Sequence, residues 1–151
     1  MNLTFKNYEE KDYSDLREMI FGLHTEDPSD NVMTEEKVKG TIRESVSHPE
    51  KLQIVMIRAD GINVGYSIIV PFWSNEYGGN IINIDELYIK KEYRNKKIAT
   101  EFMKNQEKIH RGDKTSVALQ LERSPANDSA ARFYERMGFE PSPNVQLMLL
   151  V

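Results

Sequence analysis

The residues best suited to chemistry lie at positions 84 to 103, where an apolar stretch containing Asp85 and Glu86 runs through a basic turn into an amphipathic segment. The first N–H groups of a helix lack partners inside the helix, and the helix dipole adds partial positive charge there. The turn therefore predicts an anion site from Arg94 to Thr100 that suits a pyrophosphate. The alternative is that its lysines and arginine are only solvated charges at the start of a surface helix.

Asp85 and Glu86 are candidates for a general base, because a positioned carboxylate can accept a proton from a reacting group. Strand alternation places such neighbours on opposite faces, so only one faces a substrate unless the strand bulges there. The sequence does not choose between them. The alternative is that both carboxylates are only solvated charges at a strand edge.

Residues 94–99, RNKKIA, are similar to the pattern R/Q-x-x-G-x-G/A, and residues 127–140, NDSAARFYERMGFE, are similar to N-x-x-A-x-x-F/L-Y-x-x-x-G-F. These two motifs resemble the signatures of the GCN5-related N-acetyltransferase (GNAT) family. The resemblance covers residues 52–140. Lys97 departs from it, since the family usually has glycine there. Because this stretch is expected to be helical, and helical torsions do not demand glycine, we interpret Lys97 as a tolerated variant that adds charge.

The resemblance implies an acetyl-CoA-dependent N-acetyltransferase that uses acetyl-CoA as cosubstrate and needs no metal. The backbone of residues 87–89 is expected to bind the pantetheine arm beside Asn127, with Ala130 leaving it room, and Tyr134 is expected to be the general acid. The cofactor-binding residues predicted in this way are Leu87, Tyr88, Ile89, Arg94, Asn95, Lys96, Lys97, Ile98, Ala99, Thr100, Asn127 and Ala130. An alternative interpretation is open for two of these residues: Asn127 would be only a helix cap, and Tyr134 would be only a half-buried packing residue.

The acceptor is expected to be a small primary amine such as a polyamine or an aminoglycoside, because acidic residues gather in the loops that would surround it. These residues are Glu26, Asp27, Asp30 and Glu76. Phe72, Trp73 and Tyr77 either line the same pocket or pack in a core or dimer contact. Two other interpretations remain open: a catalytically weak acetyl-CoA-binding or protein-interaction module, and a peptide or protein acetyltransferase. A homodimer formed through the C-terminal strand is also expected.

Hydrophobic periodicity predicts the elements that position these residues, in the order βααβββαβαβ. The expected strands are 3–6, 53–59, 62–72, 81–89, 115–121 and 145–151, and the expected helices are 13–24, 34–48, 94–110 and 127–137. This order indicates an α/β fold of the α+β type. We expect a mixed sheet that is largely antiparallel and has helices on both faces. The resemblance implies a splayed parallel strand pair at the cofactor site. Residues 1–151 are expected to form one domain.

Composition excludes several classes of function. The 151 residues include no cysteine, so disulfides, a thiolate nucleophile and cysteine-ligated zinc are excluded. His24, His48 and His110 match no metal motif and are expected at the surface. The formal charge of -4 argues against nucleic-acid binding. No apolar stretch is long enough for a membrane span and no secretory signal is recognised, so we expect a cytoplasmic protein without a membrane partner.

Overall fold

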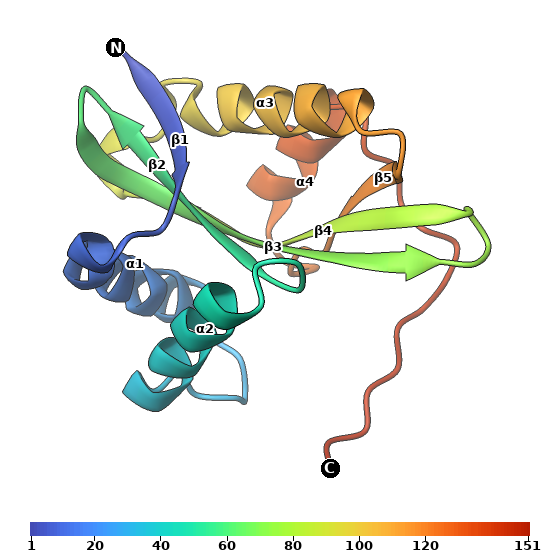
Figure 1. The fold of residues 1–151 in the computed structure, drawn as a ribbon, viewed down its shortest axis with the longest axis horizontal. Coiled ribbons are helices and arrows are strands. Elements are labelled where there is room, and N and C mark those ends of the chain that lie inside the picture. The colour runs from blue at the N-terminus through green and yellow to red at the C-terminus, as the bar shows by residue number, and fades with distance from the viewer.

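A computed structural model describes residues 1–151, and its centre is a five-stranded sheet in the order β1-β2-β3-β4-β5 (Figure 1). The strands are β1 Leu3–Asn7, β2 Gln53–Ala59, β3 Ile62–Ser74, β4 Gly79–Ile89 and β5 Ser116–Leu121. The first four pair antiparallel, whereas β5 lies parallel to β4. The predicted mixed, largely antiparallel sheet is therefore confirmed.

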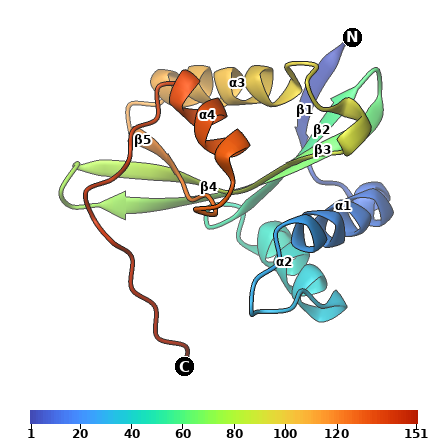
Figure 2. The same cartoon turned by 180° about the vertical axis from the view of Figure 1, so that it is seen from behind.

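Four α-helices cover the sheet, two on each face (Figures 1 and 2). They are α1 Tyr13–Glu26, α2 Glu35–Ser47, α3 Ile98–Gly112 and α4 Asp128–Arg136, with 3-10 turns at Glu10–Asp12 and Lys91–Tyr93. Helices α1 and α2 pack on one face, and α3 and α4 lie on the other. The element order predicted from the sequence is confirmed as far as α4.

Each face of the sheet has its own apolar core. On the α1 and α2 side, Leu16, Met19 and Val38 pack against Met56 and Tyr66 of the strands. On the α3 side, the core is formed by Ile57, Val64, Ile84, Ile89, Ile98, Phe102 and Met103. Strand alternation explains this division, because successive side chains of the central strands point to opposite faces.

Local sequence explains where several elements begin and end. The Thr34 hydroxyl accepts the backbone N–H of Lys37 and caps α2, as expected from the sequence. Asp60 and Gly61 have φ of 51° and 84° and form the tight turn between β2 and β3. Gly138, with φ of 89°, follows the last residues of α4 and ends it.

Strand β4 is paired on both sides only in its first half. Its pairing with β5 ends at Ile84 and Leu121, and beyond this point residues 85–89 have no partner on that side. The pairing of β3 with β4 shifts register at the same place, since Ile68 faces Glu86 and Ile69 faces Ile84. Asp85 is therefore the extra residue of a β-bulge. The bulge and the end of the parallel ladder together open the sheet beside residues 85–89.

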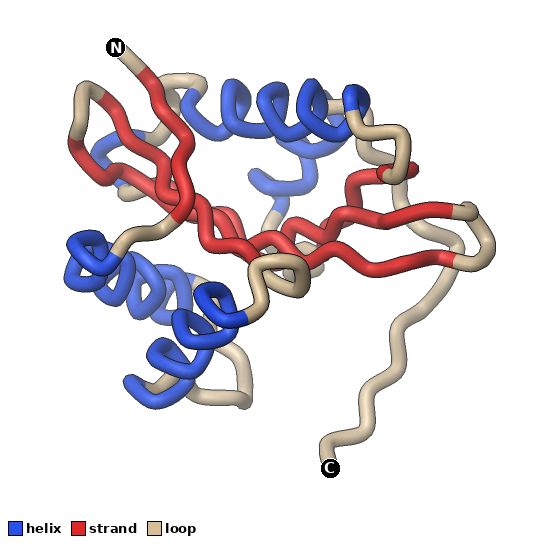
Figure 3. Tube along the Cα trace, viewed as in Figure 1, coloured by secondary structure: helices blue, strands red, loops and turns tan.

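Two predicted elements are wrong in part or in full. Residues 94–97 are not helical, because α3 begins only at Ile98. Residues 145–151 form no strand; they lie in an extended, solvent-exposed tail that runs away from the sheet (Figure 3). Pro141 and Pro143 restrict the backbone directly after Phe139, and the tail has no hydrogen-bonded neighbour along its length. Apolar sequence alone was not enough to make a strand here.

None of the helices combines the length and the apolar character that crossing a membrane requires.

Candidate active site

The opening beside β4 is a groove of about 620 Å³ that brings together most of the predicted cofactor residues. Eight predicted site residues line it: Leu87, Tyr88, Ile89, Arg94, Ala99, Asn127, Ala130 and Tyr134. The groove also reaches α1, through Leu23, Glu26 and Asp27. It is thus bounded by helices from both faces of the sheet. A strand edge left free by β5 can hydrogen-bond an extended ligand through its main chain.

Helix α4 begins at the opposite wall of the groove. The Asn127 side-chain oxygen accepts the Ala130 N–H at 3.0 Å, so Asn127 is the N-cap of α4. This bond uses the side-chain oxygen and leaves the side-chain NH2 group available to a ligand. The small side chain of Ala130 lies one turn farther along and keeps the groove open. The capping and ligand-binding interpretations of Asn127 are therefore compatible.

Tyr134 lies on the same wall and packs edge-on against Phe133 and Phe139, with ring centroids 5.0 and 5.7 Å away. Burial raises the pKa of the Tyr134 hydroxyl above its ordinary value. The hydroxyl consequently stays protonated throughout the neutral pH range. It can donate a proton or a hydrogen bond to an anion that forms in the groove.

Asp85 and Glu86 do not line the groove; Asp85 is the extra residue of the bulge at its edge, and Glu86 follows it. The Asp85 side chain keeps contact with solvent, and its pKa is raised, first by partial desolvation among the surrounding atoms and then by the negative charges of Glu86 and Glu122. Glu86 is hydrogen-bonded through both carboxylate oxygens, to His24 and to Tyr66. The strand does bulge here, which is the condition under which two neighbouring carboxylates can serve one site.

The predicted anion site changes in detail. Since α3 begins at Ile98 and its first bond joins Glu101 N–H to the Lys97 carbonyl, the free N–H groups are those of Ile98, Ala99 and Thr100. The Ile98 side chain is buried in the core below, Ala99 faces the groove and Thr100 is half-buried. Backbone donors for an anion therefore come from three residues rather than from the whole stretch 94–100.

Arg94 is held by three contacts. Its Nε donates to the Ile89 carbonyl at 2.8 Å, a terminal nitrogen donates to Glu26 at 2.8 Å, and the guanidinium lies 5.4 Å from the Tyr88 ring centroid. Glu26 also lies within 3.8 Å of Lys91. A carboxylate therefore stands at the basic end of the groove, where an incoming phosphate would compete with it for Arg94.

Asn95, Lys96 and Lys97 form the turn before α3 and do not line the groove. Asn95 and Lys97 both have φ of 61°, in the left-handed region that favours glycine. The expectation of helical torsions at Lys97 is therefore wrong, and glycine is the better residue for this position. Lys96 places its ammonium 5.1 Å from the Tyr93 ring centroid, on the outside of the turn.

Sequence reasoning missed His24 and Tyr66. His24 was expected at the surface, yet it is half-buried and its Nε2 lies 2.9 Å from a Glu86 oxygen. The Tyr66 hydroxyl donates to the other Glu86 oxygen at 2.6 Å from a fully buried position. A lone histidine at a helix end and a tyrosine within an apolar strand carry no motif, so only the fold reveals these contacts.

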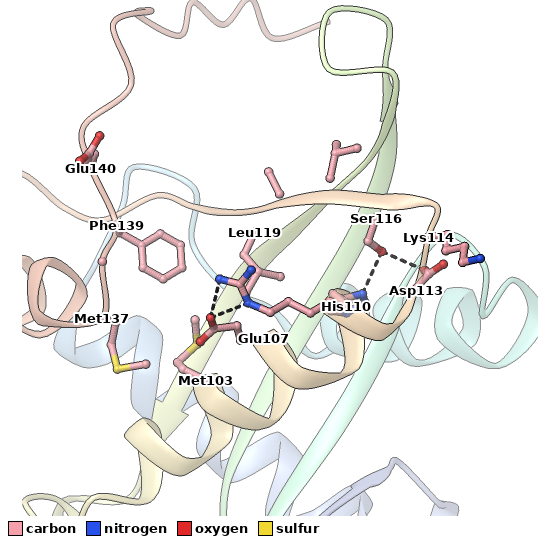
Figure 4. A pocket seen from close by; sticks show the side chains of 14 residues that line it. Met103, Glu107, His110, Asp113, Lys114, Ser116, Leu119, Met137, Phe139 and Glu140 are labelled. Atoms are coloured by element: carbon pink, nitrogen blue, oxygen red, sulfur yellow. Dashed lines mark hydrogen bonds and ion pairs between the residues drawn. The ribbon is translucent and has the colours of Figure 1, made fainter.

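His110 is also half-buried, and burial lowers its pKa. It borders a second hollow, of about 650 Å³, that lies between α3, β5 and residues 137–140 (Figure 4). There Ser116 hydrogen-bonds to both His110 and Asp113, and Arg111 pairs with Glu107. The His110–Ser116 contact joins α3 to β5, and none of the predicted site residues lies in this hollow. The structure contains no group of three or more histidine, cysteine or acidic residues placed to hold a metal ion.

Solved structures with the same fold are numerous. A possible acetyltransferase from Clostridium difficile 630 matches with a TM-score of 0.85 at 18% identity, covering 100% of this chain and 99% of that one. AAC(6')-Iy, in complex with a bisubstrate analogue of CoA, matches with a TM-score of 0.79 at 13% identity. The match covers 100% of this chain and 99% of that one. The aminoglycoside acetyltransferase meta-AAC0020 comes from an uncultured soil metagenomic sample and was solved in complex with sisomicin. It matches with a TM-score of 0.72 at 9% identity, covering 99% of this chain and 95% of that one. At such identities these likenesses concern the fold alone.

No curated protein matches the chain. The family model described as "Acetyltransferase (GNAT) family" matches residues 14–139, which include the whole groove and both signatures and end just before the exposed tail. The chain therefore belongs to the GNAT acetyltransferase family.

Proposed function

We propose that residues 1–151 work as one domain that transfers an acetyl group from acetyl-CoA to a small primary amine. The observation that carries this proposal is the free edge of β4 at residues 87–89, which faces Asn127, Ala130 and Tyr134 across one groove. Membership of the GNAT family supports acetyl-CoA as the acetyl donor. A cytoplasmic location stays a prediction from the sequence.

The groove residues fit this donor. The backbone of Leu87, Tyr88 and Ile89 and the free amide of Asn127 would hold the pantetheine arm, which is rich in amide groups. The N–H groups of Ile98, Ala99 and Thr100 would bind the pyrophosphate, with Arg94 and the lysines of the preceding turn adding positive charge. When bound, acetyl-CoA supplies an activated thioester. Arg94 would exchange its contact with Glu26 for one with a phosphate.

The acceptor end of the groove is acidic. Asp85, Glu86 and Glu122 lie close enough together at the β4 bulge that the negative charges of Glu86 and Glu122 help to raise the pKa of Asp85. Such a cluster attracts a cationic amine over a neutral or anionic one. A polyamine or an aminoglycoside fits this chemistry, and two proteins of similar fold are aminoglycoside acetyltransferases.

The reaction requires two proton movements. The acceptor ammonium first loses a proton to a base at the β4 bulge, and its nitrogen then attacks the thioester carbonyl. A new C–N bond forms, the C–S bond breaks, and the amide nitrogen releases its second proton to solvent. Tyr134 donates its proton to the departing thiolate and regains one from water. Its raised pKa keeps the hydroxyl protonated for this step.

A second function is supported by two features of the basic end of the groove. Glu26 is hydrogen-bonded to Arg94 and would compete with a phosphate for it, and the Lys97 side chain stands where glycine would let a phosphate approach the backbone closely. Both features would weaken acetyl-CoA binding. They favour a weak acetyl-CoA-binding or protein-interaction module as the alternative. A peptide or protein acetyltransferase would use the same groove with a different acceptor.

The test is free-thiol release from acetyl-CoA with a panel of polyamines, aminoglycosides, amino acids and peptides. We expect release with a small polycation. Ala130→Trp should fill the groove and abolish both calorimetric acetyl-CoA binding and release, whereas Glu135→Trp, on the exposed side of α4, should retain both. Binding without release across the panel would favour the module, and absence of binding would overturn the proposal.

We also propose that the protein self-associates through its C-terminal tail. Residues 145–151, VQLMLLV, expose apolar side chains from Val145, at 84%, to Leu149, at 87%. The outer edge of β5 has no strand partner, and its Val117 is 41% exposed. An unpaired strand edge and an exposed apolar segment are suited to each other. The tail of a second copy would supply the missing strand of a homodimer.

A further inference from the structure

His24 and Glu86 form a polar pair at the edge of the groove that the family signatures do not include. His24 lies in the last turn of α1, and its Nε2 is 2.9 Å from Glu86 Oε1. The two side chains are only 25% and 15% exposed. The other imidazole nitrogen, Nδ1, has no hydrogen-bond partner within the chain.

Glu86 is fixed from several directions. The buried Tyr66 hydroxyl donates to its Oε2 at 2.6 Å, and Ser67 Oγ donates to its backbone carbonyl at 2.8 Å. Burial and the Glu86 charge raise the pKa of Tyr66 well above its ordinary value, so this hydroxyl remains a donor. A carboxylate that accepts a bond on each oxygen is a rigid, negatively charged support for an imidazole.

The pair lies where the acceptor amine should arrive. Leu23 and Leu87, the chain neighbours of His24 and Glu86, both line the groove. Glu86 points to the α1 face of β4, whereas Leu87 packs in the core on the α3 side. The donor-binding wall at α4 and the His24–Glu86 pair therefore flank residues 85–89 from opposite faces of the sheet.

We propose that His24 is the general base of the acetyl transfer and that Glu86 orients it. This inference rests on the proposed transferase function. With Nε2–H donated to Glu86, the lone pair of Nδ1 accepts one proton from the acceptor ammonium, directly or through one water. The products of this step are a neutral amine and an imidazolium. The imidazolium is stabilised by Glu86 and by the negative end of the α1 dipole, and it releases its proton to solvent after the transfer.

Histidine suits this role better than either carboxylate. An imidazole changes its charge near neutral pH, whereas an ordinary carboxyl group does so far below it. The pKa of Asp85 is raised, but no side chain orients this exposed carboxylate in the way that Glu86 orients His24. Glu86 would also have to disturb its bonds to His24 and Tyr66 in order to take a proton. The charged or titratable groups that face His24 are Glu86 and Asp85 of β4, with Tyr66 of β3 behind Glu86.

The decisive variant is His24→Gln, because glutamine can still donate an N–H to Glu86 but cannot act as a base. We expect kcat/KM for the amine to fall about 100-fold, the size typical of a lost general base. The loss of wild-type activity at acidic pH should no longer follow an imidazole titration in the variant, and added imidazole should restore part of the rate. The matched control is His48→Gln at the exposed C-cap of α2, which should behave as wild type.

Acetyl-CoA affinity and thermal stability separate this role from a structural one, and both should stay unchanged in His24→Gln. An unchanged rate and pH profile in that variant would overturn the proposal while leaving the transferase intact. A wild type that transfers to no amine would contradict the proposed function instead. A double variant then decides the pairing: Glu86→Gln should lower kcat/KM in the wild type but have little further effect in His24→Gln, and losses that simply add would overturn the dyad.

Discussion

At the scale of single residues, Tyr134 offers the clearest separation of binding from chemistry. Tyr134→Phe keeps the aromatic contacts with Phe133 and Phe139 but removes the hydroxyl. We expect kcat to fall by about 10- to 100-fold, since the thiolate loses its proton donor. Calorimetry should show acetyl-CoA affinity within about twofold of wild type, because main-chain groups hold the pantetheine arm. A variant with wild-type turnover would remove Tyr134 from the mechanism.

The sequence could place Asn127, Ala130 and Tyr134 close together, whereas Asn95, Lys96 and Lys97 of the first signature do not line the groove. Asn127, Ala130 and Tyr134 share one helix, so their spacing alone places them on neighbouring turns. The sequence could not predict the His24–Glu86 contact, because these two residues are 62 positions apart and meet only when α1 packs on β4. Nor could it choose between Asp85 and Glu86, since that choice depends on a bulge set by the register of β3 against β4.

At the scale of elements, the turn before α3 combines a signature with an unfavourable backbone conformation. Lys97 has φ of 61°, which a Cβ-bearing residue adopts at a cost, so Lys97→Gly should stabilise the protein by about 1 kcal/mol. Urea unfolding checks this expectation. Lys96→Gly is the matched control, because its φ is not positive, and it should be neutral or destabilising. Equal effects of the two changes would contradict the assigned strain.

A buried ion pair joins the start of α1 to the hairpin of β2 and β3. Asp12 is 2% exposed. Its carboxylate accepts hydrogen bonds from the Arg58 guanidinium at 2.9 Å and from the Asn63 side-chain amide at 3.0 Å. Asp12→Ala leaves the Arg58 charge unpaired, so we expect a loss of about 3 kcal/mol in the free energy of unfolding. Asp15→Ala, which removes only one bond to Asn63, should cost less than about 1 kcal/mol.

The same pair predicts how stability depends on pH. Burial alone would raise the pKa of Asp12, but hydrogen bonds from Asn63, the Glu9 backbone and Arg58 outweigh it and lower that pKa. A lowered pKa in the folded state stabilises the protein above the unfolded value of about 4, and this contribution is lost as the pH falls through the folded value. The difference between wild type and Asp12→Ala should therefore shrink below about pH 4. A constant difference from pH 2 to pH 7 would contradict this cause.

At the scale of the whole molecule, the exposed tail should govern association. We expect the chain of residues 1–151 to form dimers as its concentration rises, and a chain ending at Asn144 to remain monomeric in analytical ultracentrifugation. Leu147→Asp combined with Leu149→Asp keeps the length and should likewise prevent association. A 151-residue chain that sediments as a monomer at every concentration would overturn the proposed dimer.

The sequence predicted the layered fold but not its C-terminus. Apolar periodicity fixes which face of α1, α2 and α3 is buried, and Asp60-Gly61 fixes one hairpin, because both depend on neighbouring residues. A strand at 145–151 would depend on a distant partner, which local pattern cannot guarantee. In the same way, the opening of the sheet depends on where the parallel pairing of β4 with β5 stops.

Because the groove is lined by α1 on one face of the sheet and by α4 on the other, it connects two separate approaches to one strand segment. If donor and acceptor each use one approach, neither blocks the other, and both are bound when the acetyl group moves. Initial-rate plots should then show intersecting rather than parallel lines. The acetylated amine can leave while CoA remains, so the two products need not depart in a fixed order.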